Sequence, residues 1–375
     1  MNPHKLLPRR RFLAGAAALA CAGCAPAAPV PRQSGALRVI GEAIVPFRAR
    51  FRETTIGGLS ALDYDSSRDC WYALSDDRSN LQPARFYTLK LPLSRDKFGP
   101  PLFTAVTTLR QADGRPYPSA RDGGDVPDPE GLRWNAASGT LLWTSEGDAR
   151  LRLAPFLRET KLDGSHVREL ELPRTLRAGD GTGPRDNLGF EGLALTPDGL
   201  GAWTAMEGPL HQDGEPPAVG RPGGPCRITL WDVPSGQPVR QFAYLPDAIP
   251  RAPLLPGTFA DNGISEILMA DAHRMLVLER SYSAGVGNSL RLYVIDTREG
   301  SDTLDSPVLR PGGYTPCRKQ RIADFAQLGL ARLDNTEGMA WGPSLPGGGR
   351  TLVVVSDDNF NPAQVTQFVA FEARL

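Results

Sequence analysis

Histidine and cysteine are scarce in this chain of 375 residues, which contains four histidines and five cysteines. Beyond the N-terminal segment only His166, His211 and His273 remain, and they fall in three different sequence contexts. Zinc and other transition metals are usually held by clustered imidazole and thiolate groups. The sequence therefore argues against a transition-metal centre of that kind.

The cysteines also limit disulfide formation. Cys21 and Cys24 lie in the N-terminal segment, so three cysteines remain and at most one disulfide bond can form among them. Cys70 lies inside an expected strand, where a buried free thiol is expected. Cys226 and Cys317 are the better candidates for a pair, because both lie in expected loops.

The best-known catalytic motifs of serine hydrolases and nucleotide-binding enzymes are missing. The pattern G-x-S-x-G does not occur, and its nearest approaches, Gly58-Leu59-Ser60 and Gly263-Ile264-Ser265, open strands and lack the closing glycine. No glycine-rich loop is followed by Lys-Ser or Lys-Thr. Neither a nucleophile elbow nor a phosphate-binding loop is expected.

The chain has no excess of basic charge, with 42 lysines and arginines against 42 aspartates and glutamates. Removal of residues 1–33 would take away five basic residues and no acidic one, which leaves 37 basic against 42 acidic side chains. A mildly acidic protein of this kind lacks the positive surface that nucleic acid requires. We expect a small-molecule ester substrate as partner and no nucleic acid.

Residues 1–35 have the features of an export signal and are not expected to belong to the fold. The run Arg9-Arg10-Arg11-Phe12-Leu13 precedes a weakly apolar stretch rich in small residues, which is the arrangement of a twin-arginine signal. An ordinary secretory signal is the alternative. Either signal predicts a periplasmic or extracellular protein.

Cys24 raises the question of a lipid anchor. It follows Ala22-Gly23, but the position three before it, where lipoprotein signals usually have leucine, is Cys21. Lipidation at Cys24 and simple cleavage near Ala25 both stay open. A lipid would anchor the protein to a membrane that the chain does not span.

Long stretches of helical periodicity are absent after residue 35, whereas 40 glycines and 35 prolines punctuate the chain. This composition favours an all-β fold with many turns. A pattern of turn, apolar strand, tight turn, second strand and acidic cluster returns five times. Its copies cover residues 57–77, 130–148, 191–208, 265–280 and 337–358.

The spacing of these copies predicts a β-propeller. Equivalent positions in successive copies are 73, 61, 74 and 72 residues apart, which suits one four-stranded blade plus loops. Outer strands are expected at 85–93, 101–110, 153–162, 166–173, 227–234, 239–247, 289–297 and 321–328. The fifth unit has only 365–373, so we expect strand 36–46 to complete it. Residues 36–375 then form a single domain of five blades, with six as the alternative.

Hairpin geometry gathers acidic side chains on one face of this propeller. Adjacent antiparallel strands place Glu130 near Glu146, Glu191 near Glu207 and Glu337 near Asp357. The expected face comprises Asp76, Asp77, Glu130, Glu146, Asp148, Glu191, Glu207, Glu279, Glu337, Asp357 and Asp358, together with Asn187, Asn335 and Asn359.

So many carboxylates repel one another unless a cation lies among them. Hard oxygen ligands favour Ca²⁺, with Mg²⁺ as the alternative. The expected ligands are Glu130, Glu191, Glu337, Asp76, Asp77, Asp357 and Asp358. The competing interpretation is that such acids only bind turn amides, and we adopt it for Asp65, Asp163 and Asp198.

Several segments resemble the phytase-like domain family. They are GGLSALDYD, YALSDDR, NLGFEGLALTPDG, AMEGPLHQDG, LVLERSYSAGVGNSLRLY, DNTEGMAWGP and VVSDDNFNPAQVTQFVAFE, and the resemblance extends from about residue 37 to residue 374. Members are described as having esterase-like activity of phytase and are typically exported bacterial proteins. The resemblance implies a propeller related to phytases, which bind calcium through channel carboxylates and hydrolyse phosphate monoesters with a metal-activated water. No phytase motif aligns with this chain residue by residue.

A more local resemblance concerns the Glu-Gly pair that opens an inner strand. It is similar to the opening of propeller lactonases and gluconolactonases, in which that glutamate is a metal ligand. Glu130, Glu191 and Glu337 each match this position. The resemblance implies a metal-binding role for this set but does not distinguish among its members.

These observations lead to one main functional hypothesis and two alternatives. The main hypothesis is an exported calcium-dependent hydrolase of phosphate or carboxylate esters. Its catalytic candidates are Glu191, Glu207, Arg280 and His211, and its substrate-binding candidates are Arg78, Arg280 and Asn359. The alternatives are a non-catalytic, calcium-stabilised propeller that binds a ligand or protein in the cell envelope, and a lactonase-like hydrolase.

Overall fold

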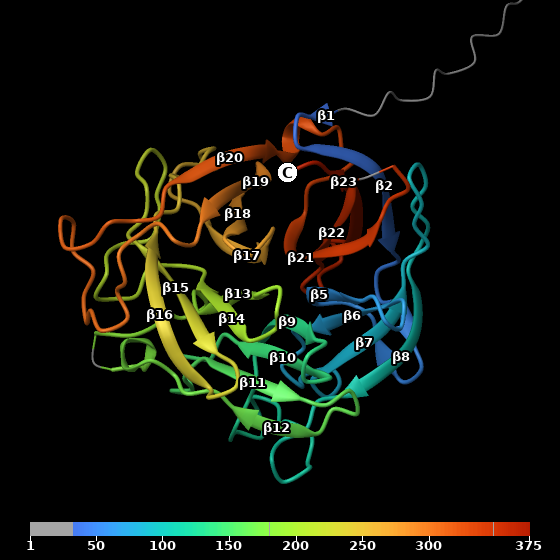
Figure 1. Cartoon of the computed structure of the whole chain (residues 1–375), viewed down its shortest axis with the longest axis horizontal. Helices are drawn as coiled ribbons and strands as arrows, with labels where there is room; N and C mark the ends of the chain where they lie inside the picture. Colours follow the sequence, from blue (N-terminus) through green and yellow to red (C-terminus); the bar gives the residue numbers. More distant parts are fainter. Residues whose placement is uncertain (1–32, 180, 348) are drawn as a thin grey trace, which may run out of the picture. The chain divides into compact units, whose positions relative to one another are not determined.

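The computed structural model describes residues 33–179, 181–347 and 349–375. The expected twin-arginine signal and Cys24 lie outside the described residues. Five antiparallel sheets are arranged as the blades of a propeller (Figure 1). Within the described residues the helical elements are two short 3₁₀ turns, η1 (Arg174–Leu176) and η2 (Phe325–Gln327). The all-β prediction is confirmed.

Each of the first four blades is a meander of four strands, counted outward from the propeller axis. Blade 1 contains β5 (Leu59–Asp65), β6 (Cys70–Ser75), β7 (Arg85–Lys90) and β8 (Leu102–Thr108), and blade 2 contains β9 (Pro129–Asn135), β10 (Thr140–Ser145), β11 (Phe156–Thr160) and β12 (His166–Glu169). Blade 3 contains β13 (Phe190–Leu195), β14 (Gly201–Met206), β15 (Cys226–Asp232) and β16 (Gln237–Tyr244), and blade 4 contains β17 (Gly263–Met269), β18 (Arg274–Ser283), β19 (Gly287–Asp296) and β20 (Lys319–Asp324).

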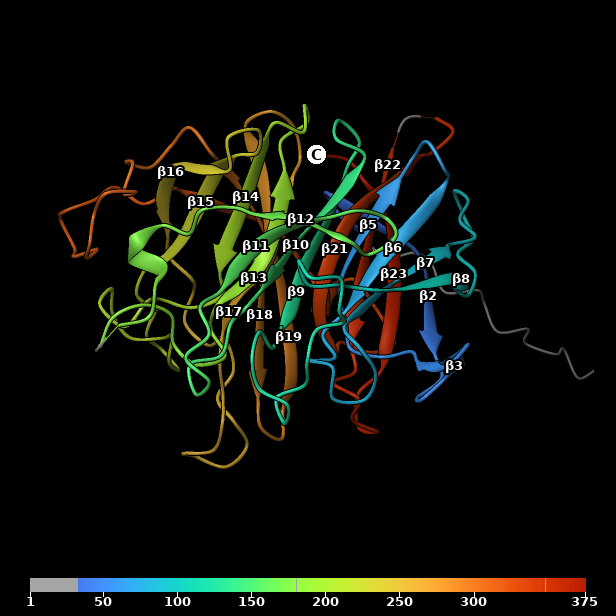
Figure 2. The same ribbon diagram turned by 90° about the horizontal axis from the view of Figure 1, so that it is seen from below.

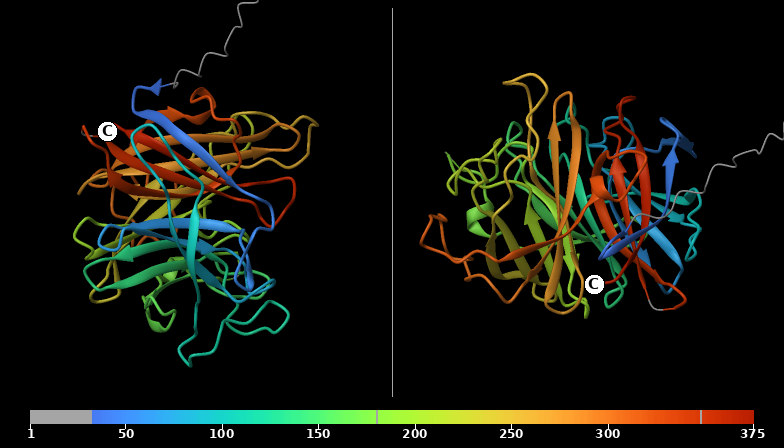
Figure 3. Two further views of the ribbon diagram at one scale, coloured as in Figure 1. Left: turned by 90° about the vertical axis from the view of Figure 1, so that its right-hand side faces the viewer. Right: turned by 90° about the horizontal axis from the view of Figure 1, so that it is seen from above.

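The fifth blade joins the two ends of the described chain. Its strands are β21 (Asn335–Ser344), β22 (Arg350–Asp357), β23 (Thr366–Ala373), β2 (Leu37–Val45) and the edge strand β1 (Gln33–Ser34). Strand β2 pairs with β23 along its whole length, and Figure 3 (left) shows the blue β2 beside the red strands. The predicted closure by the N-terminal strand and the count of five blades are confirmed. The small hairpin of β3 (Arg50–Phe51) and β4 (Thr54–Thr55) follows β2.

The hydrophobic core lies between the blades. Five clusters of buried side chains each bridge two neighbouring sheets, so that every blade is covered on both faces. Tyr72 of blade 1 and Trp134 of blade 2, for example, pack with ring centroids 5.8 Å apart. This packing explains why the strands read as nearly continuous apolar runs.

Every inner strand carries a register shift, typical of a β-bulge, near its start. The extra residue is Ser60, Glu191, Ser265 and Glu337 in blades 1, 3, 4 and 5, respectively. In blade 2 the two residues Glu130 and Gly131 lie opposite the single residue Thr144. A bulge bends the strand and redirects the side chain at the extra residue. The three Glu-Gly pairs therefore place their glutamates at the same bulged position in three blades.

The glycine of each pair allows neighbouring inner strands to approach closely. A Cβ atom on Gly192 would lie 2.9 Å from the amide nitrogen of Ile267, and one on Gly131 would lie 2.7 Å from Cβ of Leu193. Since real Cβ atoms do not approach other atoms so closely, a larger residue would push two blades apart. In each pair the glutamate thus contributes to the acidic face, and the glycine allows the close packing of neighbouring blades.

The disulfide prediction was wrong. Cys70, Cys226 and Cys317 are all buried free thiols. Cys226 begins β15 and donates to the carbonyl of Glu207, while Cys317 donates to the carbonyl of Glu299. Sequence context did not reveal that these two cysteines make separate contacts.

Among the described residues, no helix is long and apolar enough to span a membrane.

Candidate functional site

A cavity of about 700 Å³ opens at the end of the propeller where the inner strands begin. Charged groups dominate its wall. Eight carboxylates line it, those of Asp76, Asp128, Glu130, Glu146, Glu191, Asp261, Asp334 and Glu337, together with three guanidiniums, those of Arg78, Arg280 and Arg332. Asn187, Asn335 and Asn359 also contribute to the wall. The predicted acidic face therefore corresponds to a cavity.

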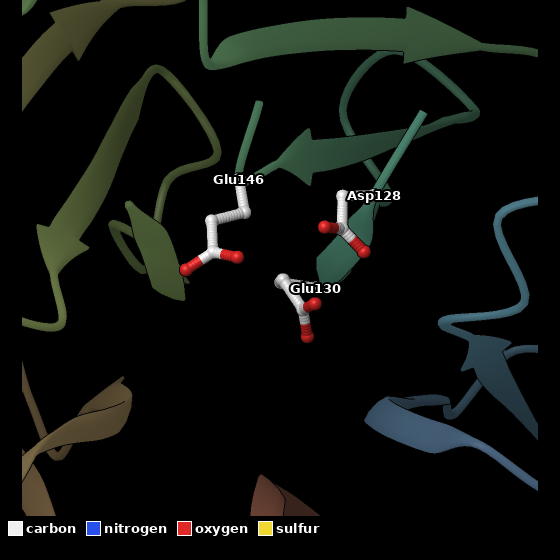
Figure 4. Close-up of side chains that lie close together, drawn as sticks. All are labelled: Asp128, Glu130 and Glu146. Atoms are coloured by element: carbon white, nitrogen blue, oxygen red, sulfur yellow. The ribbon is translucent and has the colours of Figure 1, made fainter. Parts of the chain in front are cut away.

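Two groups of carboxylates lie close enough to share a cation. Asp128, Glu130 and Glu146 form one group, which Figure 4 shows in close-up around the start of β9 and the end of β10. Glu146, Glu191 and Glu207 form the other, and within each group the candidate ligand oxygens lie within 4.8 Å of one another. The predicted proximities of Glu130 to Glu146 and of Glu191 to Glu207 are confirmed. Glu146 belongs to both groups.

Burial and mutual repulsion raise the pKa values of these carboxyl groups. Burial, and then the charge of Glu191, raises the pKa of Glu130 well above its ordinary value of 4.5. Burial raises the pKa of Asp128 and of Glu207 to about 7 and that of Glu337 to about 8, although the nearby arginines oppose these shifts. Buried carboxyl groups that repel one another are stabilised either by protonation or by a neighbouring cation.

Arg280, near the end of β18, links two blades across the cavity. Its guanidinium donates to Oε1 of Glu207 at 2.8 Å and to Oδ1 of Asn335 at 2.5 Å, and it lies 3.8 Å from Oε1 of Glu337. Its Nε atom is buried and has no hydrogen-bond partner among the described residues. One donor of this guanidinium is therefore left without a protein acceptor.

Arg78 has an equivalent place at the end of the first hairpin. It bonds to Asp148 and lies 3.4 Å from a carboxylate oxygen of Asp128. Its Nε atom, like that of Arg280, has no partner within the described chain. Both arginines predicted to bind substrate thus line the cavity, and both also form ion pairs with neighbouring acids.

The adjacent residues Asp76 and Asp77 face different surroundings. Asp76 lines the cavity, and burial followed by the charge of Asp357 raises its pKa well above the ordinary value. Asp77 instead pairs with the buried guanidinium of Arg85 at 2.7 Å and accepts three backbone amides of residues 80–82. The structure brings Asp76, but not Asp77, to the cavity.

Neither member of the second acidic pair lines the cavity. Asp357 is buried against Asn335 and accepts the amide of Asn359, and burial and the charge of Glu337 raise its pKa. Asp358 accepts the amides of Gly58 and Phe360, which is a turn-binding role. Among this group Asn359 lines the cavity, whereas Asp357 and Asp358 do not.

Two other predicted residues, the catalytic candidate His211 and Glu279 of the expected face, lie elsewhere. His211 is exposed to solvent and does not line the cavity, so the structure does not bring it to the other catalytic candidates. Glu279 is buried and bonds to Tyr244, Asn262 and Lys319. Position at a hairpin end was therefore not sufficient to place a side chain in the cavity.

Sequence reasoning missed three of the cavity carboxylates, Asp128, Asp261 and Asp334. A signal existed for Asp128, which comes two residues before Glu130, because side chains two apart in an extended strand point to the same face. Asp261 and Asp334 lie in the loops before β17 and β21. Their place depends on loop conformation, for which the sequence offers no comparable pattern.

Several solved structures show a low similarity to this chain. They include hydrazine synthase of Kuenenia stuttgartiensis (10% identity, 87% of this chain and 67% of that chain, TM-score 0.35) and a protein from Lactobacillus plantarum (14%, 80% and 64%, 0.36). The Dos1 propeller is a third (10%, 86% and 68%, 0.35). These TM-scores are too low to support an argument about function.

No protein with a curated description matches the chain. A family model does match, over residues 54–360, and that family is the phytase-like family, described as esterase-like activity of phytase. The match covers blades 1 to 4 and the whole inner hairpin of blade 5, including all eight carboxylates of the cavity wall. With its five-bladed propeller and a match over most of its length, the chain belongs to the phytase-like family.

Proposed function

We propose that this protein is a calcium-dependent hydrolase that cleaves phosphate or carboxylate esters in the cavity at the strand starts. One observation carries the proposal: Glu146 belongs to two groups of closely spaced carboxylates and lines a cavity that two arginines with unpartnered Nε atoms also line. The description of the family as esterase-like supports the same reaction class.

The residues present fit a calcium ion. All candidate ligand atoms in the two groups are carboxylate oxygens, and Ca²⁺ binds six to eight oxygens at about 2.3–2.6 Å. Two oxygens on opposite sides of one such ion are then about 5 Å apart, which is close to the 4.8 Å limit within each group. When bound, the cation lowers the pKa of a water molecule and offsets negative charge that develops on the ester.

The side chains of the chain supply the remaining functions. Glu191 or Glu207, whose oxygens lie within 4.8 Å of each other, accepts a proton from the water that attacks the ester, and it returns that proton to the alcohol that leaves as the ester bond breaks. Arg280 holds Glu207 through Nη2, and its guanidinium, which lines the cavity, offsets the negative charge that develops on the ester. Arg78 and Asn359 lie on the cavity wall, where they contact the bound ester.

The proposal includes export. The twin-arginine arrangement at residues 9–13 supports an activity outside the cytoplasm, and calcium modules of extracellular proteins commonly work at about 10⁻⁴–10⁻³ M calcium. Lipid attachment at Cys24 would keep this activity at a membrane surface.

The test is an assay of the purified protein on p-nitrophenyl phosphate and p-nitrophenyl acetate, first with calcium and then with a chelator. We expect the hydrolysis rate to depend on calcium. In Glu191→Gln the rate should fall by at least about a hundredfold. Glu215→Gln, which removes an exposed acid outside the cavity, should leave the rate unchanged. Activity that survives chelation contradicts the metal-dependent mechanism. No activity on any ester favours a non-catalytic, calcium-stabilised propeller.

A further inference from the structure

Two aromatic side chains form part of the cavity wall beside the charged groups. Phe259, in the loop between β16 and β17, and Tyr282, near the end of β18, both line the cavity, with ring centroids 6.2 Å apart. Phe259 is 65% exposed, and Tyr282 is 36% exposed. Large aromatic surfaces left open to water beside a cavity are typical of ligand contacts.

Backbone hydrogen bonds hold this aromatic pair in place. The segment 251–261 runs along the tip of the long β18–β19 hairpin, and Figure 2 shows both extending on the same side of the molecule. Leu254 donates to the carbonyl of Ala284, Ala284 donates to that of Phe259, and Asp261 donates to that of Tyr282, all at 2.9–3.0 Å. The exposed rings therefore belong to an ordered wall and are available to a ligand without rearrangement.

The charge of the cavity limits the substrate that it can accept. Eight carboxylates face three guanidiniums, and each guanidinium already has a carboxylate partner. Even two divalent cations would leave one excess negative charge on the wall. A substrate with many phosphate groups would meet repulsion here, because like charges in a partly desolvated cavity are strongly unfavourable.

We infer that the natural substrate carries one reacting ester group on an apolar arm, and that this arm lies on Phe259 and Tyr282. The inference rests on the proposed hydrolase function and names its substrate class. The ester group reaches the carboxylates and Arg280 at the strand starts, while an alkyl or aryl arm covers the two rings. The same geometry selects against polyphosphorylated compounds such as inositol hexakisphosphate.

Calorimetric titration of the full protein in calcium with methylphosphonate and with hexylphosphonate tests this inference. We expect hexylphosphonate to bind at least about tenfold more tightly, since each buried methylene group favours binding. Phe259→Ser should remove the preference, and Phe259→Leu should keep most of it. Leu255→Ser is the matched control, because Leu255 is 66% exposed on the same segment but does not line the cavity.

Each result decides the matter. Equal affinities for the two phosphonates, no binding of either, or tighter binding of inositol hexakisphosphate would overturn the inference. If Leu255→Ser lost the preference for hexylphosphonate as Phe259→Ser does, the loss would come from disturbed folding of the segment. That result would also overturn the inference. A preference for hexylphosphonate in a protein that hydrolyses no ester would support the apolar site while the proposed hydrolase function fails.

Discussion

Arg133 and Glu266 form a buried ion pair, with Nη2 and Oε2 2.7 Å apart, that contacts the inner strands of all five blades. Arg133, in β9, donates to the carbonyls of Leu62 in β5, Ile267 in β17 and Met339 in β21. Glu266, in β17, accepts the amide of Leu193 in β13. Arg133 also lines a separate cavity at the opposite end of the inner strands. The pair therefore links the inner strands of all five blades at a level between the two cavities.

Loss of Arg133 should destabilise the whole propeller. Arg133→Met leaves the carboxylate of Glu266 buried without its partner, which typically costs about 3–5 kcal/mol in the free energy of unfolding. Arg133→Met combined with Glu266→Gln should recover part of that loss, and Arg115→Met, at an exposed ion pair, should change stability by less than about 1 kcal/mol. Unfolding in denaturant measures all three. A loss below about 1 kcal/mol for Arg133→Met would contradict this account.

The glycine that follows Glu191 should be required for packing. In Gly192→Ala the new methyl group meets Ile267 of the next blade at 2.9 Å, and we expect a loss of about 1–3 kcal/mol in the free energy of unfolding. Gly35→Ala is the control, because nothing lies within 4 Å of that position. Thermal unfolding of both variants provides the comparison. An unchanged melting temperature for Gly192→Ala would show that the inner strands tolerate a Cβ there.

The metal-free protein should become less stable as the pH rises from about 5 to about 8. In the folded state the pKa values of Asp128 and Glu207 are raised to about 7 and that of Glu337 to about 8, whereas their ordinary values are 3.8 and 4.5. Between the two sets of pKa values, the folded protein therefore holds protons that the unfolded chain has released. The stability that is present at low pH is lost as the pH rises through the pKa values of the folded state.

Calorimetric scans of the metal-free protein at several pH values test this prediction. The gain in melting temperature on adding calcium should grow over the same pH range, because the cation replaces the protons. Glu337→Gln should flatten the pH dependence of the metal-free form. A melting temperature that rises between pH 5 and 8 without metal would be the opposite of what we expect.

Asp76 and Asp77 should respond differently to the same substitution. Asp77→Asn weakens the buried pair with Arg85 and should lower the free energy of unfolding by about 3 kcal/mol while calcium affinity stays the same. Asp76→Asn removes a half-buried carboxylate that neighbouring acids repel, so it should not lower the stability of the metal-free protein but should weaken calcium binding. Equal effects of the two substitutions on stability would refute this division of roles.

Periodicity predicted the fold well because it reports which residues are buried. The five repeated hairpins became the inner strand pairs, and strand 36–46 closed the ring as β2. The site was predicted less completely. Glu130, Glu191 and Glu337 could be found because each lies at the same bulged position before glycine. His211 and Asp358 were misplaced because the direction of a loop side chain depends on tertiary contacts.

The pairing of Arg133 with Glu266 was not apparent from the sequence either. The two residues are 133 positions apart and belong to different blades. Glu266 directly follows the bulged residue of its strand, at the position where blades 2, 3 and 5 have Gly131, Gly192 and Gly338. A charged residue at that position was a signal, but its partner could be identified only once the inner strands were brought together.

Calorimetric titration of calcium into the metal-free protein tests the central claim most directly, with Glu146→Gln compared against Glu215→Gln. The account predicts that the wild type and Glu215→Gln bind calcium, and that Glu146→Gln binds it at least about tenfold more weakly, because Glu146 belongs to both carboxylate groups. Absence of calcium binding by the wild type, or equal binding by Glu146→Gln, would contradict the account.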